Sequence, residues 1–379
     1  MLTSGEILIR ADRTSSRLQV TTRSTRTQAV AAALTGYDVR TPFAPKLLGT
    51  VFALCPEAHR AAWQGAIARA LGQPPDARLE LRVRCEVVLE HLRFLAFTAP
   101  KALHLSLPPD LRPLGALRLM LQNTRWNDVR DRARLECALN QAFENFVAGV
   151  PVEHFEALTS LSALTAWMRR GATVAARLLH ALWTTPLVLP AANLPFLSPR
   201  SPLDAARWLD APGFDPLAPK VLGRALLTGA VARQASHPLV AEMLQTDGGL
   251  SLRPLFAARL LEAALLVANR NASLLVRTAS PAPREGIALV EGARGLLIHR
   301  LRLNRQGTHA ERVAIVAPTE WNFAPEGAAS QWLSALEVRD ERELLEKARR
   351  ICTGLDPCVP CRWEVRFEAP GTGKGGCRA

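Results

Sequence analysis

The pattern of apolar and polar positions divides the chain into three parts. Apolar and polar side chains alternate around residues 7–9 and 18–20, which is the period of a short β-hairpin or meander. From about 55 to 270 the apolar positions recur at the spacing of amphipathic helices, and from about 273 to 330 they alternate again. The pattern therefore predicts a helical bundle with strands before and after it.

The best-defined helix is expected to begin beside Cys55 and to end near Leu71. Pro56 suits the first helical position, where its missing N–H has no intrahelical partner, and Gly72 suits the residue after a helix. An Ala-rich helix should precede it, after residue 28. The other helices are expected at 76–97, 132–150, 163–183, 204–209, 219–234, 255–269 and 334–353.

The strand-rich segment should form a β-meander with a turn around Gly307. Its strands are expected at 274–277, 286–291, 295–304 and 312–316. Together these elements predict an α+β, helix-rich fold that forms one domain over residues 1–364. The Gly-rich end, residues 365–379, is expected to be a disordered tail.

The composition limits the classes of partner. The 379 residues are 48% hydrophobic, as in an ordinary folded protein. The formal net charge is +13, and five of the 47 basic residues are Lys while 42 are Arg, spread along the chain without a nucleic-acid-binding motif. We therefore expect a solvated basic surface that would fit an acidic protein partner, and we expect no nucleic acid.

Neither an export signal nor a membrane span is expected. No apolar run follows the charges of residues 1–17, and the most apolar stretch, 172–197, is interrupted by charged residues and prolines. We expect a cytoplasmic protein. Its seven cysteines form no regular framework, so they are expected to be reduced thiols.

Candidate metal chemistry lies near both ends of the chain. Cys358 and Cys361 stand three positions apart between prolines, so both thiols can point at one metal ion. A pair is rarely a complete site, because soft metals usually take three or four ligands. Far upstream, Cys55 and His59 stand at helical i, i+4 spacing. We expect the fold to bring the two ends together around a metal centre.

Four stretches, taken in order, resemble the motifs of the large subunit of nickel–iron hydrogenases. Residues 52–59 resemble its first Cys-x-x-Cys pair with a His four positions on, and 291–299 resemble its Glu-Ala-Pro-Arg-Gly-x-Leu-x-His segment. Residues 318–325 resemble Pro-Thr-Thr-Trp-Asn-x-x-Pro, and 356–361 match the last motif, which begins Asp-Pro-Cys-x-x-Cys. The resemblance covers most of the chain and implies the large-subunit fold, with its small β-meanders near a cofactor pocket.

The resemblance implies roles for the thiols. In that family four thiolates bind nickel, and the second Cys of each pair also bridges to iron. Cys55, Cys358 and Cys361 match three of the four positions, whereas Phe52 stands where the first Cys belongs. An apolar ring in place of a thiolate leaves an incomplete nickel site, so nickel is not expected.

The same resemblance implies a set of residues for diatomic ligands on iron. Arg294 would donate hydrogen bonds to a cyanide nitrogen, and Thr319, with the backbone near Pro318, would bind a second cyanide. His59 is expected to bind the cofactor as a hydrogen-bond donor beside the metal.

Further departures from the motifs point away from catalysis. Thr50 stands where an Arg normally precedes the first pair, and the N-terminal glutamate that carries protons has no convincing counterpart. Glu364 stands where a His marks the processing site, so no cleavage is expected. We therefore predict no catalytic residues.

The loss of the nickel side, with the iron side kept, resembles hydrogenase accessory proteins of the HupK/HoxV type. The resemblance implies a maturation scaffold that transiently carries iron with cyanide and carbonyl ligands. Its partners would be the maturation proteins that donate the iron unit and the hydrogenase large-subunit precursor that accepts it.

Other hypotheses remain open at this point. Cys358 and Cys361 could be a thioredoxin-like redox pair, or could join Cys55 and His59 in a Cys₃His zinc site of a docking protein. A divergent hydrogenase catalytic subunit is a further alternative. Arg294 could be a structural residue paired with Glu291 or Glu364.

Overall fold

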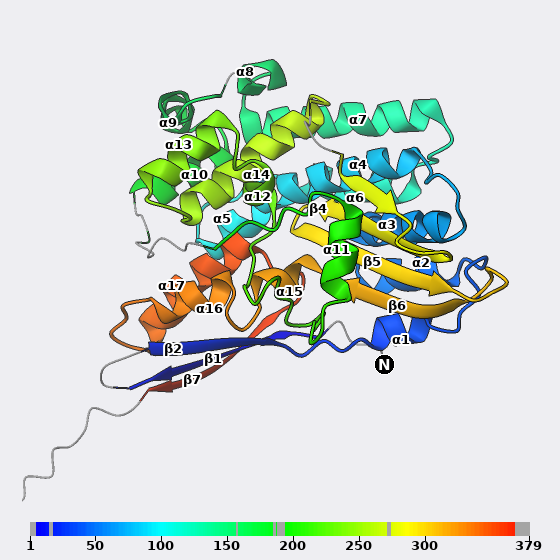
Figure 1. Ribbon diagram of the computed structural model, residues 1–379. Helices are drawn as coiled ribbons and strands as arrows, with labels where there is room; N and C mark the ends of the chain where they lie inside the picture. Colours follow the sequence, from blue (N-terminus) through cyan, green and yellow to red (C-terminus); the bar gives the residue numbers. More distant parts are fainter. Residues whose placement is uncertain are drawn as a thin grey trace, which may run out of the picture.

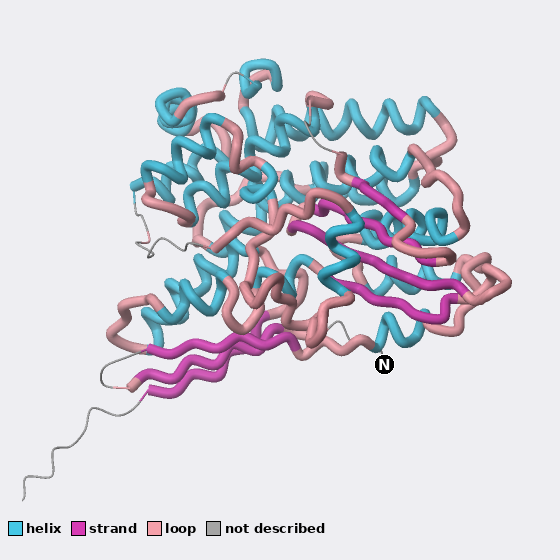
Figure 2. Tube along the Cα trace, in the orientation of Figure 1, coloured by secondary structure: helices cyan, strands magenta, loops and turns pink. Residues whose placement is uncertain are grey.

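The computed structural model describes residues 5–14, 18–156, 158–184, 187, 194–270 and 274–367. Its architecture is α+β and rich in helix, as predicted (Figure 1). Figure 2 shows two separate groups of strands, one within the helical body and one along an edge of the molecule. The predicted order of a hairpin, a helical body and a meander is therefore confirmed.

The edge sheet joins the two ends of the chain. The predicted hairpin is present as β1 (Ile7–Arg13) and β2 (Leu18–Ser24), which pair antiparallel. A third strand, β7 (Cys361–Phe367), pairs parallel to β1, with Cys361 opposite Ile7. Residues 365–367, predicted as tail, therefore belong to a strand, because β1 offers them a hydrogen-bonding edge. The rest of the predicted tail, 368–379, lies outside the described residues.

The second sheet is the predicted meander, in the order β3-β4-β5-β6. Its bounds are β3 (Val276–Ala279), β4 (Glu285–Gly292), β5 (Gly295–Leu303) and β6 (Ala310–Val316). Gly307 adopts a positive φ of 71° in the last turn, as predicted.

Helices cover both faces of this sheet. Alternate residues of β4 contribute to two different cores: Ala288 and Val290 pack with α3 (Pro56–Ala70), whereas Ile287 and Leu289 pack with α11 (Pro202–Leu209). The approach of α3 is close, because a Cβ at Gly286 would lie 1.8 Å from the carbonyl oxygen of Ala66. The sheet thus sets the position of α3.

The remaining helices form the body seen in Figure 1. α14 (Leu252–Val267) is buried around most of its circumference and forms the centre of this body. The other helices are α1 (Ala29–Leu34), α2 (Phe43–Val51), α4 (Arg78–Arg93), α5 (Ala99–Ala102), α6 (Arg112–Asn123), α7 (Val129–Phe143), α8 (Val152–Glu156), α9 (Leu161–Arg170), α10 (Val174–Thr184), α12 (Ala230–Arg233), α13 (Pro238–Thr246), α15 (Pro318–Asn322), α16 (Ala328–Ser334) and α17 (Glu341–Leu355). α4 and α7 continue into π-helical turns at Phe94–Thr98 and Glu144–Ala148.

Several helix predictions are wrong in extent. The segment 163–183 is two helices, because Gly171 ends α9 with a left-handed φ of 59°. Only Ala230–Arg233 of the predicted 219–234 is helical, since Gly229 has a φ of 129° just before it. The last helix begins at Glu341, where the Asp340 side chain accepts a hydrogen bond from the Glu343 N–H.

Among the described residues, no helix is long and apolar enough to cross a membrane.

Candidate metal and cofactor pocket

The first wall of the pocket is the N-terminus of α3. Cys55 lies at the N-cap and Pro56 at the first helical position, as predicted. The buried carboxyl group of Glu86 accepts hydrogen bonds from the N–H groups of Glu57, at 2.7 Å, and Ala58, at 2.9 Å. Burial raises the pKa of Glu86 to about 8, against the opposing effect of these two bonds. Glu86 thus holds the helix end that carries Cys55 and His59.

The pocket unites four segments that are distant in the sequence. Cys55 and His59 line it from α3, Arg294 from the turn between β4 and β5, Pro318 from the start of α15, and Cys358 from the loop before β7. The structure therefore brings five of the predicted site residues to one place. Its other lining residues are Ala58, Glu86, Glu90, Gly292, Ala293, Gly295, Leu297 and Ala317.

Cys358 is held by two residues. The Thr319 hydroxyl lies 3.0 Å from the Cys358 sulfur and accepts a 3.1 Å hydrogen bond from the Cys358 N–H. Arg26 donates a hydrogen bond of 2.8 Å from Nη2 to the same sulfur. Thr319 thus contacts the thiol directly, although the sequence predicted it as a partner for cyanide.

Arg26 is the main cation beside this thiol. It also pairs with buried Glu320 at 3.3 Å. Burial alone would lower the pKa of Arg26, but the negative charges of Cys358 and Glu320 outweigh burial and raise it. Arg26 therefore stays charged beside the sulfur of Cys358.

Cys55 occupies a less polar environment than Cys358. Burial raises the pKa of the Cys55 thiol well above its usual range, and the charges of Cys358 and Glu86 raise it further. Arg294 and Arg26 oppose this shift. Cys55 is therefore a thiol in the absence of a metal, and binding a metal there must release a proton.

Arg294 is buried between two carboxylates. Its Nη2 lies 3.1 Å from Glu90, and its Nε lies 3.3 Å from Asp356. Burial would lower the pKa of Arg294, but Asp356 and Glu90 raise it. The alternative pairing with Glu291 or Glu364 is wrong. Those carboxylates bind Arg233 and Arg10 instead, on other elements.

His59 lies between two rings. Phe52 stacks on it with the ring centroids 3.6 Å apart and the planes 2° from parallel. Its Nδ1 lies 3.0 Å from Nε2 of His299, which places His299 beside the site. Burial lowers the pKa of both imidazoles, so both are neutral at pH 7 and one donates to the other. The ring of Phe52 fills space beside the pocket where the motif would place a thiol.

Cys361 is not among the described residues that line the pocket. It is the first residue of β7. Interaction with the thiol of Cys352, in α17, lowers the pKa of Cys361. Within the described ranges, no three Cys, His, Asp or Glu side chains are grouped so that they could hold a metal ion together. Metal binding by Cys361 stays a prediction.

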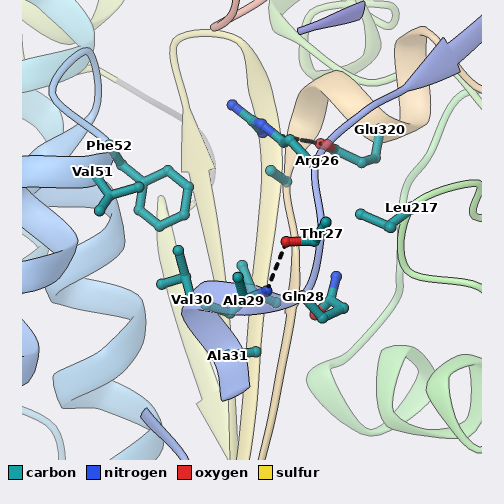
Figure 3. A pocket seen from close by; sticks show the side chains of 12 residues that line it. Arg26, Thr27, Gln28, Ala29, Val30, Ala31, Val51, Phe52, Leu217 and Glu320 are labelled. Carbon is teal, nitrogen blue, oxygen red and sulfur yellow. Dashed lines mark hydrogen bonds and ion pairs between the residues drawn. The ribbon is translucent and has the colours of Figure 1, made fainter. Parts of the chain in front are cut away.

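A second pocket adjoins the first, and Ala317 lines both. Figure 3 shows Val51 and Phe52 on one side of it and Leu217 and Glu320 on the other. Arg26 lines this pocket while its guanidinium reaches Cys358. Arg26 and Phe52, which line the second pocket, therefore contact Cys358 and His59 of the first.

Arg26, Glu86 and Glu90 were not predicted as site residues, and Asp356 was predicted only as part of a motif. Asp356 lies within a recognised motif, and its position before the Cys pair was a usable signal. The other three lie in helical or strand patterns with no local feature that marks them. Their importance comes only from tertiary contacts, such as the one between Glu90 and Arg294 across 204 positions.

The sequence of this chain is similar to those of nickel-dependent hydrogenases and of hydrogenase expression/formation proteins. The family model described as "Nickel-dependent hydrogenase" matches residues 223–363. The chain is 28% identical to the hydrogenase expression/formation protein HoxV of Cupriavidus necator, over 84% of this chain and 86% of that protein. It is 29% identical to the hydrogenase expression/formation protein HupK of Bradyrhizobium diazoefficiens, over 83% of this chain and 84% of that protein. The resemblance to the HupK/HoxV type is confirmed.

The fold is that of hydrogenase large subunits. The Ni-Fe-Se hydrogenase from D. vulgaris Hildenborough aligns with a TM-score of 0.56 at 14% identity, over 91% of this chain and 94% of that chain. The Ni-Fe-Se hydrogenase from Desulfomicrobium baculatum aligns with a TM-score of 0.55 at 15% identity, over 94% and 97%. At this identity the likeness establishes the fold alone.

Proposed function

We propose, from its similarity to hydrogenase expression/formation proteins of the HupK/HoxV type, that this chain is a non-catalytic scaffold for hydrogenase maturation. It would take up an iron unit with cyanide and carbonyl ligands and pass it to the precursor of a hydrogenase large subunit. The iron unit is cargo in this proposal, so the pocket must bind it and also release it.

One observation supports the proposal most. Two thiols, Cys55 and Cys358, share a pocket with the buried guanidinium of Arg294, and a second guanidinium, that of Arg26, contacts Cys358. Iron that arrives with its own diatomic ligands needs few protein ligands, and thiolates suit it. The cations favour an anionic iron–cyanide unit, because charge pairs are strengthened away from water.

Each predicted residue has a task in this scheme. Arg294 donates hydrogen bonds to a cyanide nitrogen, and the start of α15 at Pro318 and Thr319 supplies polar contacts for a second. His59, which lines the pocket, is the hydrogen-bond donor beside the metal. Cys361, the first residue of β7, is the third thiol ligand in this scheme.

Phe52 limits the scaffold to iron. Its ring is stacked on His59, so the position that would hold a fourth thiolate is apolar. A site short of one thiolate does not complete a nickel centre. It also binds the iron unit less tightly than the precursor would, which favours transfer. We propose that the transfer takes place in the cytoplasm, between maturation proteins that donate the unit and the precursor that accepts it.

The proposal is tested by infrared spectroscopy with metal analysis on the full-length protein, purified without oxygen from its own host. We expect cyanide and carbonyl bands with iron and without nickel. Cys55→Ala and Cys358→Ala should each lose the bands, whereas Cys85→Ala, which removes a buried thiol outside the pocket, should keep them.

Two outcomes would contradict the proposal. Stoichiometric zinc with no infrared bands would indicate a zinc-stabilised docking protein. Nickel together with hydrogen uptake would indicate a divergent catalytic subunit.

A further inference from the structure

The edge sheet has one closed edge and one open edge. In the order β2-β1-β7, the outer strands are β2 and β7. The edge of β2 is closed by α16, because the Val20 N–H donates a 3.0 Å hydrogen bond to the Ser334 hydroxyl, which donates one of 3.2 Å to the Val20 carbonyl oxygen. β7 lies on the side of the sheet away from α16 (Figure 1). The two edges therefore differ in what they offer to another molecule.

Alternate residues of β7 point their backbone groups away from β1. The Ile7 N–H donates a 2.9 Å hydrogen bond to the Pro360 carbonyl oxygen. With the parallel register of the two strands, β1 therefore bonds to the even-numbered residues of β7, and the N–H and C=O groups of the odd-numbered residues face outward. Within the described part of the chain, no other element forms a backbone hydrogen bond with Trp363, Val365 or Phe367. β7 is therefore an open edge that can pair with a further strand.

The side chains of β7 also suit a further strand. Trp363, Val365 and Phe367 are half-buried and pack against the main core from the inner face of the sheet. On the outer face, Arg362, Glu364 and Arg366 alternate in charge, and neither a proline nor a bulge interrupts the strand. A strand placed beside β7 would extend both the apolar face and the charged face.

The charge pattern of β7 is complementary to itself. If Val365 stands opposite Val365 of a second copy in an antiparallel pair, Glu364 stands opposite Arg366 of that copy, and Trp363 stands opposite its Phe367. Opposite charges and aromatic pairs directly across a ladder stabilise a sheet. Glu364 already pairs with Arg10 of β1 at 2.9 Å, so the new Arg would continue an alternating row of charges across the strands.

We propose that β7 pairs antiparallel with β7 of a second copy of this chain, so that two three-stranded edge sheets form one continuous sheet. The contact is isologous, with its twofold axis at Val365. The alternation of charge favours a second copy over a uniformly acidic or basic strand, which would meet like charge on β7. The dimer forms without iron, so it is independent of the proposed function.

The association is measured by sedimentation velocity of the purified full-length protein at about 1–100 μM, with a reductant that keeps its seven cysteines as thiols. One strand edge buries less surface than a standard interface, so we expect a reversible dimer with a dissociation constant in the micromolar range. A protein that stays monomeric up to the highest concentration would overturn the proposal.

Val365→Pro tests the edge directly. It removes an outward-facing N–H, and proline is tolerated at such positions of an edge strand. We expect β7 to keep its bonds to β1 and the dimer to weaken at least about tenfold, which is about 1.4 kcal/mol. The matched control is Val365→Thr, which keeps the N–H and the branched side chain and should dimerise like wild type. A proline variant that dimerises as tightly as wild type would place the contact elsewhere and contradict the proposal.

Charge variants test the same edge without changing the backbone. Glu364→Arg makes the outer face of β7 wholly basic, and the double variant Arg362→Glu/Arg366→Glu makes it wholly acidic. Each should be monomeric alone because like charges stand opposite each other, whereas an equimolar mixture should form a heterodimer. Circular dichroism checks that each variant is folded. If the mixture of folded variants stays monomeric, or either variant alone dimerises like wild type, the proposal fails.

Discussion

The guanidinium of Arg26 donates a 2.8 Å hydrogen bond to the sulfur of Cys358, across 332 positions of sequence. The same guanidinium pairs with Glu320, which follows Thr319 in α15. Arg26 therefore connects the segment after β2 with the two segments that hold the C-terminal thiol. This connection places the cation beside the pocket and holds the segments of α15 and Cys358 together.

Breaking the ion pair between Arg26 and Glu320 should be costly. Their side chains are 10% and 2% exposed, so Arg26→Met leaves a buried carboxylate without its cation. We expect the free energy of unfolding to fall by about 3–5 kcal/mol in chemical denaturation. Adding Glu320→Gln should restore at least part of this loss. Arg10→Met, which breaks an exposed pair with Glu364, should cost less than about 1 kcal/mol. A double variant no more stable than Arg26→Met would contradict this account.

Replacing Phe52 by Cys should create nickel affinity. The motif places a thiol at this position, where the ring now stacks on His59 and the Phe52 carbonyl accepts a hydrogen bond from the Cys55 N–H. We expect Phe52→Cys to bind nickel at least about tenfold more tightly than wild type, which is about 1.4 kcal/mol. The measurement is a nickel titration followed by thiolate-to-metal absorption. Phe52→Ser opens the same space without a thiol. Equal affinity in both variants would show that space, and not the missing ligand, limits nickel binding.

Glu86 should make stability depend on pH. Burial raises its pKa from 4.5 to about 8, so the folded state favours the protonated carboxyl. This contribution to stability is complete below pH 4.5 and is lost as the pH rises through 8. At about 1.4 kcal/mol per pKa unit, wild type should lose about 2–5 kcal/mol relative to Glu86→Gln between pH 4.5 and 9. The measurement is urea unfolding of wild type and Glu86→Gln across this pH range. If the free energies of unfolding of the two proteins change in parallel with pH, the prediction is wrong.

Gly286 should be intolerant of any side chain. A Cβ there would lie 1.8 Å from the Ala66 carbonyl oxygen and 2.8 Å from the Ala70 nitrogen, both in the backbone of α3. Gly286→Ala should therefore displace α3, lower the free energy of unfolding by about 1–3 kcal/mol or more, and weaken iron retention through Cys55. The matched control is Gly115→Ala within α6, where nothing lies within 4 Å of the added Cβ. It should stabilise by about 0.5–1 kcal/mol. If both variants retain wild-type stability and iron, the close approach of β4 and α3 is not needed.

Local sequence signals predicted much of the fold. They failed where tertiary contacts determine the end of a helix or the partner of a strand. α3 was predicted nearly to its ends because Pro56 and Gly72 mark them in the sequence. The break at Gly171 was missed because the apolar spacing continues across it. The parallel pairing of β7 with β1 has no local signal, since each strand finds its partner at the other end of the chain.

The residues of the site were likewise predicted where a local motif marks them and missed where only tertiary contacts do. The motifs predicted Cys55, Arg294 and Cys358, and the structure places all three in one pocket. The charges that surround them were not predictable. Asp356 binds both Arg259 and Arg294 from a left-handed position after α17, which only the folded chain shows.

The pairing of β7 with β1 also determines when the pocket can exist. Cys358 lies just before β7, and Cys361 stands opposite Ile7 in the edge sheet. During translation the first strand is made hundreds of residues before its parallel partner, and closing so long a loop is slow compared with local folding. A nascent chain that has not yet exposed Cys358 has neither the second thiol nor the strand that follows it. Under the proposed function, iron would therefore be loaded only after synthesis, and prematurely terminated chains would not compete for it.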